Sequence, residues 1–113
     1  TYSIRPLTIN DLSEYKSLRL YALKTEPAFF RSSYREEAVF LREHWAQRLT
    51  NPKGTIFGLF HFAELIGITA IMIEDEGHGY LTHSYIRPQH RRQNLSTLLF
   101  QTRINWAKDR KLK

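Results

Sequence analysis

The pattern of apolar and polar residues changes period along the chain. Residues 2–7 predict a short strand, and two apolar stripes with the spacing of helices follow it. The stripes consist of Leu12, Tyr15, Leu18 and Ala22, and of Ala38, Leu41, Trp45 and Leu49. Pro27 lies between the stripes, and a proline ring ends a helix. The first half of the chain is therefore predicted to form one strand and two helices.

Helix starts are predicted where a capping residue precedes an acidic residue by three positions. Asp11 with Glu14 and Ser33 with Glu36 both have this spacing, in which each side chain can bond the other's main-chain N–H. Glu37 follows directly, and we interpret it with Glu36 as a pair of charges at a helix N-terminus.

The second half of the chain begins with strand-like patterns. Residues 55–62 and 65–73 are apolar and rich in β-branched and aromatic residues, which predicts an antiparallel hairpin of buried strands. Ala63 and Glu64 are not a favoured pair for a tight turn, so we expect a loop longer than two residues. Residues 80–86 predict a third strand. A final helix is marked by Leu95, Leu98, Leu99, Thr102 and Trp106.

The predicted element order is β-α-α-β-β-β-α in a single domain, residues 1–113. This is an α+β fold with a central, mainly antiparallel sheet flanked by helices. A helix that follows a strand usually leads to a parallel strand beside it. We therefore expect that the C-terminal strands of a larger fold are missing from this sequence, or that a second copy supplies a strand in a homodimer.

Composition narrows the class of protein. The 113 residues are 42% hydrophobic and 25% charged, which fits one globular domain and excludes a wholly disordered chain. No apolar run approaches the ~20 residues that cross a bilayer, and there is no cysteine, so we expect a cytoplasmic protein without membrane contact. His44 and His61 have no partners at metal-ligand spacing, so we expect no metal site.

Positive charge gathers in the last quarter of the chain. The net charge is +6, and residues 87–113 hold eight basic residues against one acid. Such a segment attracts an anion, either a phosphate-bearing cofactor or nucleic acid, although a solvated helix face is the simpler explanation. The basic residues lack interleaved aromatic side chains, which argues against nucleic acid.

The segment with the clearest chemistry joins the third strand to the final helix. The strand runs through a basic, polar loop directly into the helix, whose first turn has main-chain N–H groups without partners. Such a loop can surround a phosphate with backbone donors, and Arg91 and Arg92 add positive charge in front of them.

This segment resembles the signature of the GNAT superfamily of acetyl-CoA-dependent N-acetyltransferases. The strand ends in IRP at residues 86–88, the loop at residues 91–96 is RRQNLS, and an apolar pair follows at residues 98–99. The order of the elements is similar as well, across essentially the whole chain. Asn94 stands where the family usually has glycine, and asparagine is the residue that best tolerates a left-handed backbone after glycine. Ser96 stands where the family has glycine or alanine.

The resemblance implies transfer of an acetyl group from acetyl-CoA to a primary amine by direct attack. The amine would belong to a small molecule or a peptide. Backbone groups at the end of the third strand would face the thioester, and the amides of residues 91–97 would hold the pyrophosphate. The implied cofactor-binding residues are Tyr85, Ile86, Arg91, Arg92, Gln93, Asn94, Leu95, Ser96 and Thr97.

Direct attack also requires a base, or a water relay, that keeps the amine neutral. No carboxylate lies within residues 80–86, so His83 is the candidate catalytic residue, and a neutral sheet histidine is the alternative interpretation. Glu74 could act through water, or could be a solvated turn residue. The competing hypothesis for the whole chain is a CoA-binding or regulatory module without turnover, because the loop lacks glycine and strands are expected to be missing.

Overall fold

The computed structural model describes residues 2–30, 33–73 and 79–110, with the backbone alone described at residues 29 and 79–83. Its centre is a sheet of four strands in the order β1-β2-β3-β4, and every neighbouring pair is antiparallel. The strands are β1 (Tyr2–Pro6), β2 (Gly54–His61), β3 (Glu64–Ile73) and β4 (Gly79–Ile86). The predicted α+β fold is confirmed.

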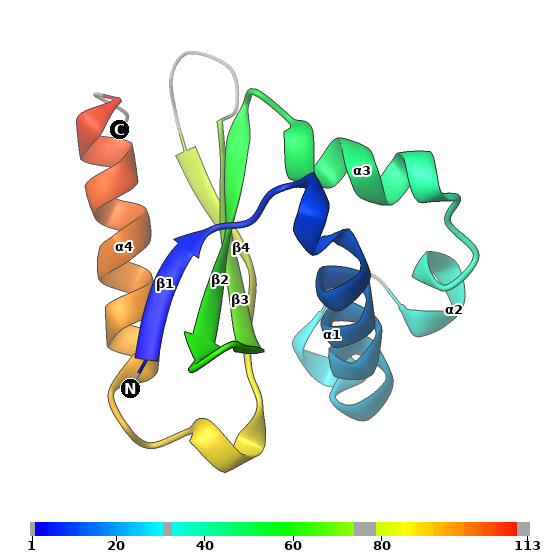
Figure 1. Cartoon of the computed structure of the whole chain (residues 1–113), viewed down its shortest axis with the longest axis horizontal. Coiled ribbons are helices and arrows are strands. Elements are labelled where there is room, and N and C mark those ends of the chain that lie inside the picture. Colours follow the sequence, from blue (N-terminus) through cyan, green and yellow to red (C-terminus); the bar gives the residue numbers. More distant parts are fainter. Residues whose placement is uncertain (1, 31–32, 74–78, 111–113) are drawn as a thin grey trace.

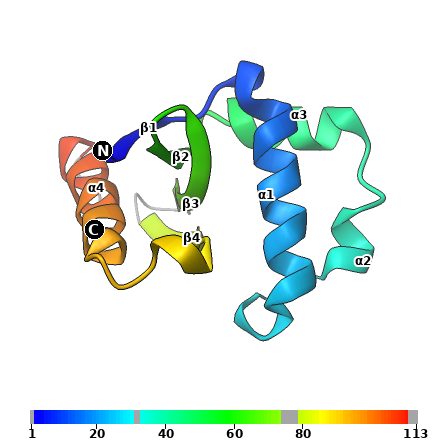
Figure 2. The same ribbon diagram turned by 60° about the horizontal axis from the view of Figure 1, so that its bottom comes forward.

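Helices cover both faces of this sheet. The helices are α1 (Leu12–Thr25), α2 (Tyr34–Glu37), α3 (Arg42–Thr50) and α4 (Leu95–Asp109). Figures 1 and 2 show α4 alone on one face and α1 with α3 and α2 on the other. Short 3-10 turns are η1 (Ile9–Asp11), η2 (Pro27–Phe29) and η4 (Pro88–His90). In the part of the chain that is described, no helix is both long and apolar enough to cross a membrane.

The second predicted helix is two helices in the structure. Ser33 begins α2, and its Oγ accepts a hydrogen bond from the Glu36 N–H at 3.2 Å, as its capping-box spacing predicts. The chain then leaves the helical path, and Leu41 has an extended backbone and an exposed side chain before α3 begins. Leu41 is therefore not part of the apolar stripe, whereas Trp45 is fully buried.

The predicted capping box of Asp11 with Glu14 is wrong. The carboxylate of Asp11 already accepts hydrogen bonds from the Arg5 guanidinium at 2.8 and 2.9 Å and from the Thr8 N–H at 2.8 Å. Thr8 and Asp11 form the box instead, around η1, and α1 continues from it. The hydrogen bond from Arg5 is the main reason that the pKa of Asp11 falls to about 2.

The turn between β2 and β3 is shorter than expected. His61 pairs with Glu64, so only Phe62 and Ala63 connect the two strands. Phe62 adopts a left-handed backbone with φ of 57°. A positive φ gives a two-residue turn the twist that antiparallel strands need, and here Phe62 adopts it in place of the usual glycine or asparagine.

The two faces of the sheet have separate hydrophobic cores. The core facing α1 and α3 includes Tyr15, Leu18, Trp45, Phe60, Ile68 and Tyr85. The core facing α4 includes Leu59, Ile66, Ile86, Leu95 and Leu99, with a smaller cluster of Phe57, Ile71 and Trp106. Leu95 and Leu99 thereby fix the first turns of α4 against the carboxyl end of β4.

A buried ionic cluster joins the three helices of the other face. Glu37 is fully buried and accepts hydrogen bonds from Arg19 at 3.1 and 3.0 Å and from Arg48 at 2.9 Å. Glu36 and Glu37 do lie in the first turn of α2, as the sequence predicts, but the side chain of Glu37 is buried in the ionic cluster. The two guanidinium groups compensate the charge of its buried carboxylate.

Candidate functional site

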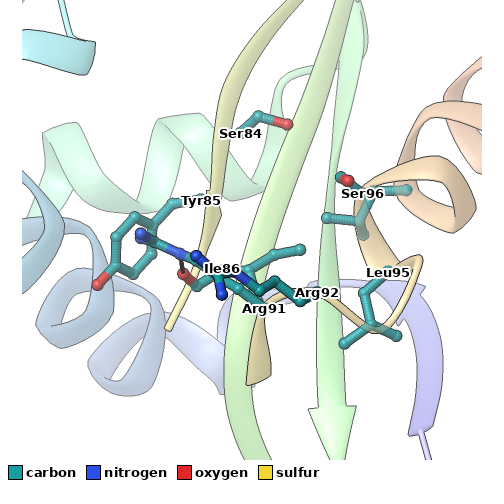
Figure 3. A pocket seen from close by; sticks show the side chains of 8 residues that line it. Ser84, Tyr85, Ile86, Arg91, Arg92, Leu95 and Ser96 are labelled. Atoms are coloured by element: carbon teal, nitrogen blue, oxygen red, sulfur yellow. Dashed lines mark hydrogen bonds between the residues drawn. The ribbon is translucent and has the colours of Figure 1, made fainter. Parts of the chain in front are cut away.

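A cavity of about 300 Å³ lies between the carboxyl end of β4 and the first turns of α4. Figure 3 shows how side chains from the strand, the connecting loop and the helix surround it. The lining residues are Ser84, Tyr85, Ile86, Arg91, Arg92, Leu95, Ser96 and Leu99. Its wall therefore combines apolar side chains with two arginines, a composition that suits a long ligand with an anionic part.

The wall of the cavity formed by β4 contains a β-bulge. The pairs Ile68–Tyr85 and Ala70–Thr82 leave one residue on β3 and two on β4 between them. An extra residue interrupts the ladder and redirects the backbone, a device that often occurs beside active sites. Among the described strands β4 is also the last in the sheet, so its outer edge has no strand partner there.

The predicted base, His83, is in this bulge. Its backbone belongs to β4, and its side chain lies outside the described part of the structure. All of Glu74 also lies outside the described residues. Neighbouring Ser84 faces α4, and its Oγ is 3.0 Å from the Oγ1 of buried Thr69.

The loop that follows β4 contains two residues with left-handed backbones. Arg92 has a φ of 66° and Asn94 a φ of 61°, and Asn94 is the N-cap of α4 without a capping hydrogen bond from its side chain. The asparagine thus adopts the conformation for which glycine is usually required. Alternation of this kind turns successive N–H groups toward one side, as in known anion-binding loops.

The main-chain donors of this loop are the central feature of the site. The Arg91 N–H is bonded to the Pro88 carbonyl at 3.3 Å, and the Leu98 N–H to the Asn94 carbonyl at 3.2 Å. Between them, the N–H groups of residues 92–97 have no acceptor within the described part of the protein. Six free donors at the positive end of a helix dipole can hydrogen-bond an anion. The Arg91 amide, which the resemblance includes in the series, is already bonded within the protein.

The side chain of Arg91 turns away from these donors. Its Nε donates to the Ile86 carbonyl at 2.7 Å, its Nη2 forms an ion pair with Glu26, and its guanidinium lies over the Tyr85 ring. The hydrogen bond with Glu26 raises the pKa of Arg91. Arg91 therefore connects the loop to β4 and to the end of α1. Arg92 pairs with no acid among the described residues, which leaves its charge for a ligand.

A contact with β1 supports the loop from the other side. The Tyr2 hydroxyl lies 2.9 Å from His90 Nδ1 and donates to Gln93 Oε1 at 3.2 Å. The rings of His61 and His90 are also adjacent, with centroids 5.0 Å apart. Sequence reasoning missed this support because Tyr2 is 88 positions from His90, and no local pattern indicates such a contact.

The residues predicted to bind the cofactor lie either in the wall of the cavity or beside it. Tyr85, Ile86, Arg91, Arg92, Leu95 and Ser96 line the cavity. Leu95 contributes its N–H to the free donors, while its side chain is buried in the core. Gln93, Asn94 and Thr97 are exposed beside the cavity and contribute main-chain donors.

Comparisons with known proteins agree with this architecture. Residues 17–113 match the model of the Acetyltransferase (GNAT) family. The fold is similar to that of a predicted acetyltransferase from Clostridium acetobutylicum with acetyl-CoA, at 20% identity and a TM-score of 0.78, over 100% of this chain and 77% of that one. It is similar to the PaiA N-acetyltransferase of Thermoplasma acidophilum in complex with coenzyme A, at 19% identity and a TM-score of 0.79, over 99% and 75%.

A third similar structure is an aminoglycoside acetyltransferase from an uncultured soil metagenomic sample, in complex with sisomicin. It shares 16% identity and a TM-score of 0.78, over 99% of this chain and 73% of that one. At these identities the three structures establish a shared fold. A search of curated proteins found no match.

Proposed function

Because the chain belongs to the GNAT family of acetyltransferases, we propose that it transfers an acetyl group from acetyl-CoA to a primary amine. The observation that carries this proposal is the series of free N–H groups at residues 92–97, at the mouth of the cavity. Similar structures that hold acetyl-CoA or coenzyme A support the choice of co-substrate. We further propose that residues 1–113 act as one domain.

The loop residues would hold the pyrophosphate of acetyl-CoA mainly through the main chain. The N–H groups of residues 92–97 supply the hydrogen bonds, and the guanidinium of Arg92 supplies charge. The Arg91 side chain would act indirectly, because it holds the loop in position through its contacts with the Ile86 carbonyl and Glu26. Main-chain groups near Tyr85 and Ile86, at the end of the bulged strand, would face the thioester.

In the proposed reaction, acetyl-CoA donates its acetyl group directly to the amine, without a covalent enzyme intermediate. The amine nitrogen forms a bond to the acetyl carbon, the carbon–sulfur bond breaks, and the proton lost by the amine balances the one gained by the thiolate. The protein must accept that proton or pass it to water. His83, in the bulge of β4, is the proposed base.

A charge substitution at Ser96 tests the proposed anion site. Ser96 is exposed in the first turn of α4, where an acidic residue stabilises a helix. Ser96→Glu should therefore leave the thermal unfolding temperature unchanged or higher. It should weaken acetyl-CoA binding at least about tenfold in calorimetry, because the carboxylate repels the pyrophosphate.

The matched control is Ser96→Gln, which has the same size without the charge and should bind within about threefold of the original protein. Release of free thiol from acetyl-CoA should then be followed with a panel of amines. Equal binding by the Glu and Gln variants, or no binding by the unaltered chain, would overturn the proposal. Binding without thiol release from any amine would favour the non-catalytic module.

A further inference from the structure

The side of β4 that faces α1 carries polar groups without protein partners. Tyr85 is only 5% exposed, and its hydroxyl forms no hydrogen bond of good geometry within the described ranges, although Thr25 and Arg91 lie near it. The Nε of Arg87 is likewise buried without a partner there. Strand alternation places these two residues on the same side, and Figure 3 shows Tyr85 directed away from α4 and toward α1. Buried donors left unpaired are costly, so a ligand that pairs with them is favoured.

The end of α1 supplies the opposite charge on the same side. Glu26, just after α1, has a largely buried side chain and gives one carboxylate oxygen, Oε2, to Arg91. Its other oxygen, Oε1, accepts no hydrogen bond from the described residues. The C-terminal end of α1 adds the negative end of a helix dipole, which also attracts cations.

An exposed aromatic ring lies against the guanidinium of Arg87. The guanidinium carbon of Arg87 lies 5.1 Å from the ring centre of Tyr21, which is on α1 and 46% exposed. This ring holds the Arg87 guanidinium in place, and no acid among the described residues forms an ion pair with it. Tyr85 lies beside this group and also lines the cavity. Tyr85 is therefore the residue that connects the α1 side of β4 to the cavity.

We propose that the acceptor is an amino-acid-like molecule with a carboxylate as well as an amine. Arg87 and the hydroxyl of Tyr85 bind the carboxylate, and the free oxygen of Glu26 attracts the amine. This inference rests on the proposed acetyl transfer and specifies its acceptor. A guanidinium and a carboxylate on one surface match a zwitterion better than a polycationic amine, which the unpaired charge of Arg87 would repel.

The test compares acceptors that differ only in the carboxylate. Thiol release from acetyl-CoA is measured for the common amino acids, for their carboxamides and for the amines that remain after decarboxylation. We expect kcat/KM to be at least about tenfold higher for the best amino acid than for its two counterparts, because each counterpart leaves Arg87 unpaired. Equal or higher values for the counterparts would overturn the inference.

Substitution of Arg87 provides the second arm. Arg87→Gln should raise KM for the best amino acid about tenfold, leave KM for its carboxamide nearly unchanged, and leave the Kd for acetyl-CoA unchanged. Arg42→Gln, which removes the same charge from the exposed start of α3, is the control and should change none of these values.

The two proposals fail in distinguishable ways. If acetyl-CoA binds and only amines without a carboxylate are acetylated, the acceptor inference is wrong and the acetyltransferase proposal stands. If acetyl-CoA binds and no member of the panel releases thiol, the acceptor inference is also wrong. If acetyl-CoA does not bind in calorimetry, both proposals are wrong.

Discussion

A single backbone conformation decides whether the loop can present its donors. Asn94 has a φ of 61° at the point where the chain enters α4. This conformation is costly for most residues and easy for glycine, and asparagine is the side chain that best accepts it. The left-handed backbone at this position was correctly expected from the sequence, because asparagine stands where the GNAT family usually has glycine. The second left-handed residue, Arg92, had no such signal.

Substitutions at position 94 should separate backbone conformation from side-chain chemistry. Asn94→Gly should keep the affinity for acetyl-CoA within about threefold, because glycine adopts positive φ freely. Asn94→Val should weaken binding about tenfold, because left-handed backbone costs a β-branched residue ~1–2 kcal/mol. Calorimetry measures both. The conformational argument is wrong if the Gly and Val variants bind equally well.

At the scale of the elements, the hydrophobic periods predicted every strand and the two long helices. Predictions from local pattern failed where a tertiary contact took the place of the local contact that the pattern indicated. Asp11 did not cap α1 because Arg5 holds its carboxylate, and Leu41 did not continue a helical stripe because the chain breaks after α2. The burial of Glu37 likewise depends on distant partners, Arg19 and Arg48, which pair with its carboxylate. A hydrophobic period shows which positions of an element are apolar. It does not show which distant side chain will form a hydrogen bond or an ion pair with a residue of that element.

The ionic cluster around Glu37 should contribute strongly to stability. Glu37→Gln should lower the free energy of unfolding by ~3 kcal/mol, because Arg19 and Arg48 would retain their positive charges around a neutral group. Urea unfolding measures the change. The control is the exposed neighbour Glu36→Gln, for which less than ~0.5 kcal/mol is expected. Equal losses in the two variants would show that the buried charge is not the cause.

At the scale of the molecule, the sequence located the positive charge, and the structure shows which part of it can reach a ligand. Arg91 is used internally, Arg103 is buried within α4, and Lys108 lies at the far end of that helix. Of the arginines before α4, Arg92 is the one that lines the cavity without an acidic partner among the described residues. Net charge alone could not make this distinction, because it depends on contacts between distant segments.

One positive charge can be removed just before α4 and another near its C-terminal end, and the two effects can be compared. Arg92→Gln should weaken acetyl-CoA binding several-fold and reduce its dependence on salt, since exposed charges are screened over about 10 Å at 0.1 M ionic strength. Lys108→Gln removes the same charge about 20 Å along the helix and should have little effect. Calorimetry at low and high sodium chloride measures both. Similar effects for the two variants would indicate general attraction rather than a local contact.

The support that Tyr2 gives to His90 and Gln93 has a consequence for how the protein folds. It joins residues 88 and 91 positions apart, so nearly the whole chain must be arranged before the contact can form. Contacts that close such long loops form late because their entropic cost comes first. The donor loop should therefore reach its final shape among the last events of folding, and ligand binding would then report that folding is complete.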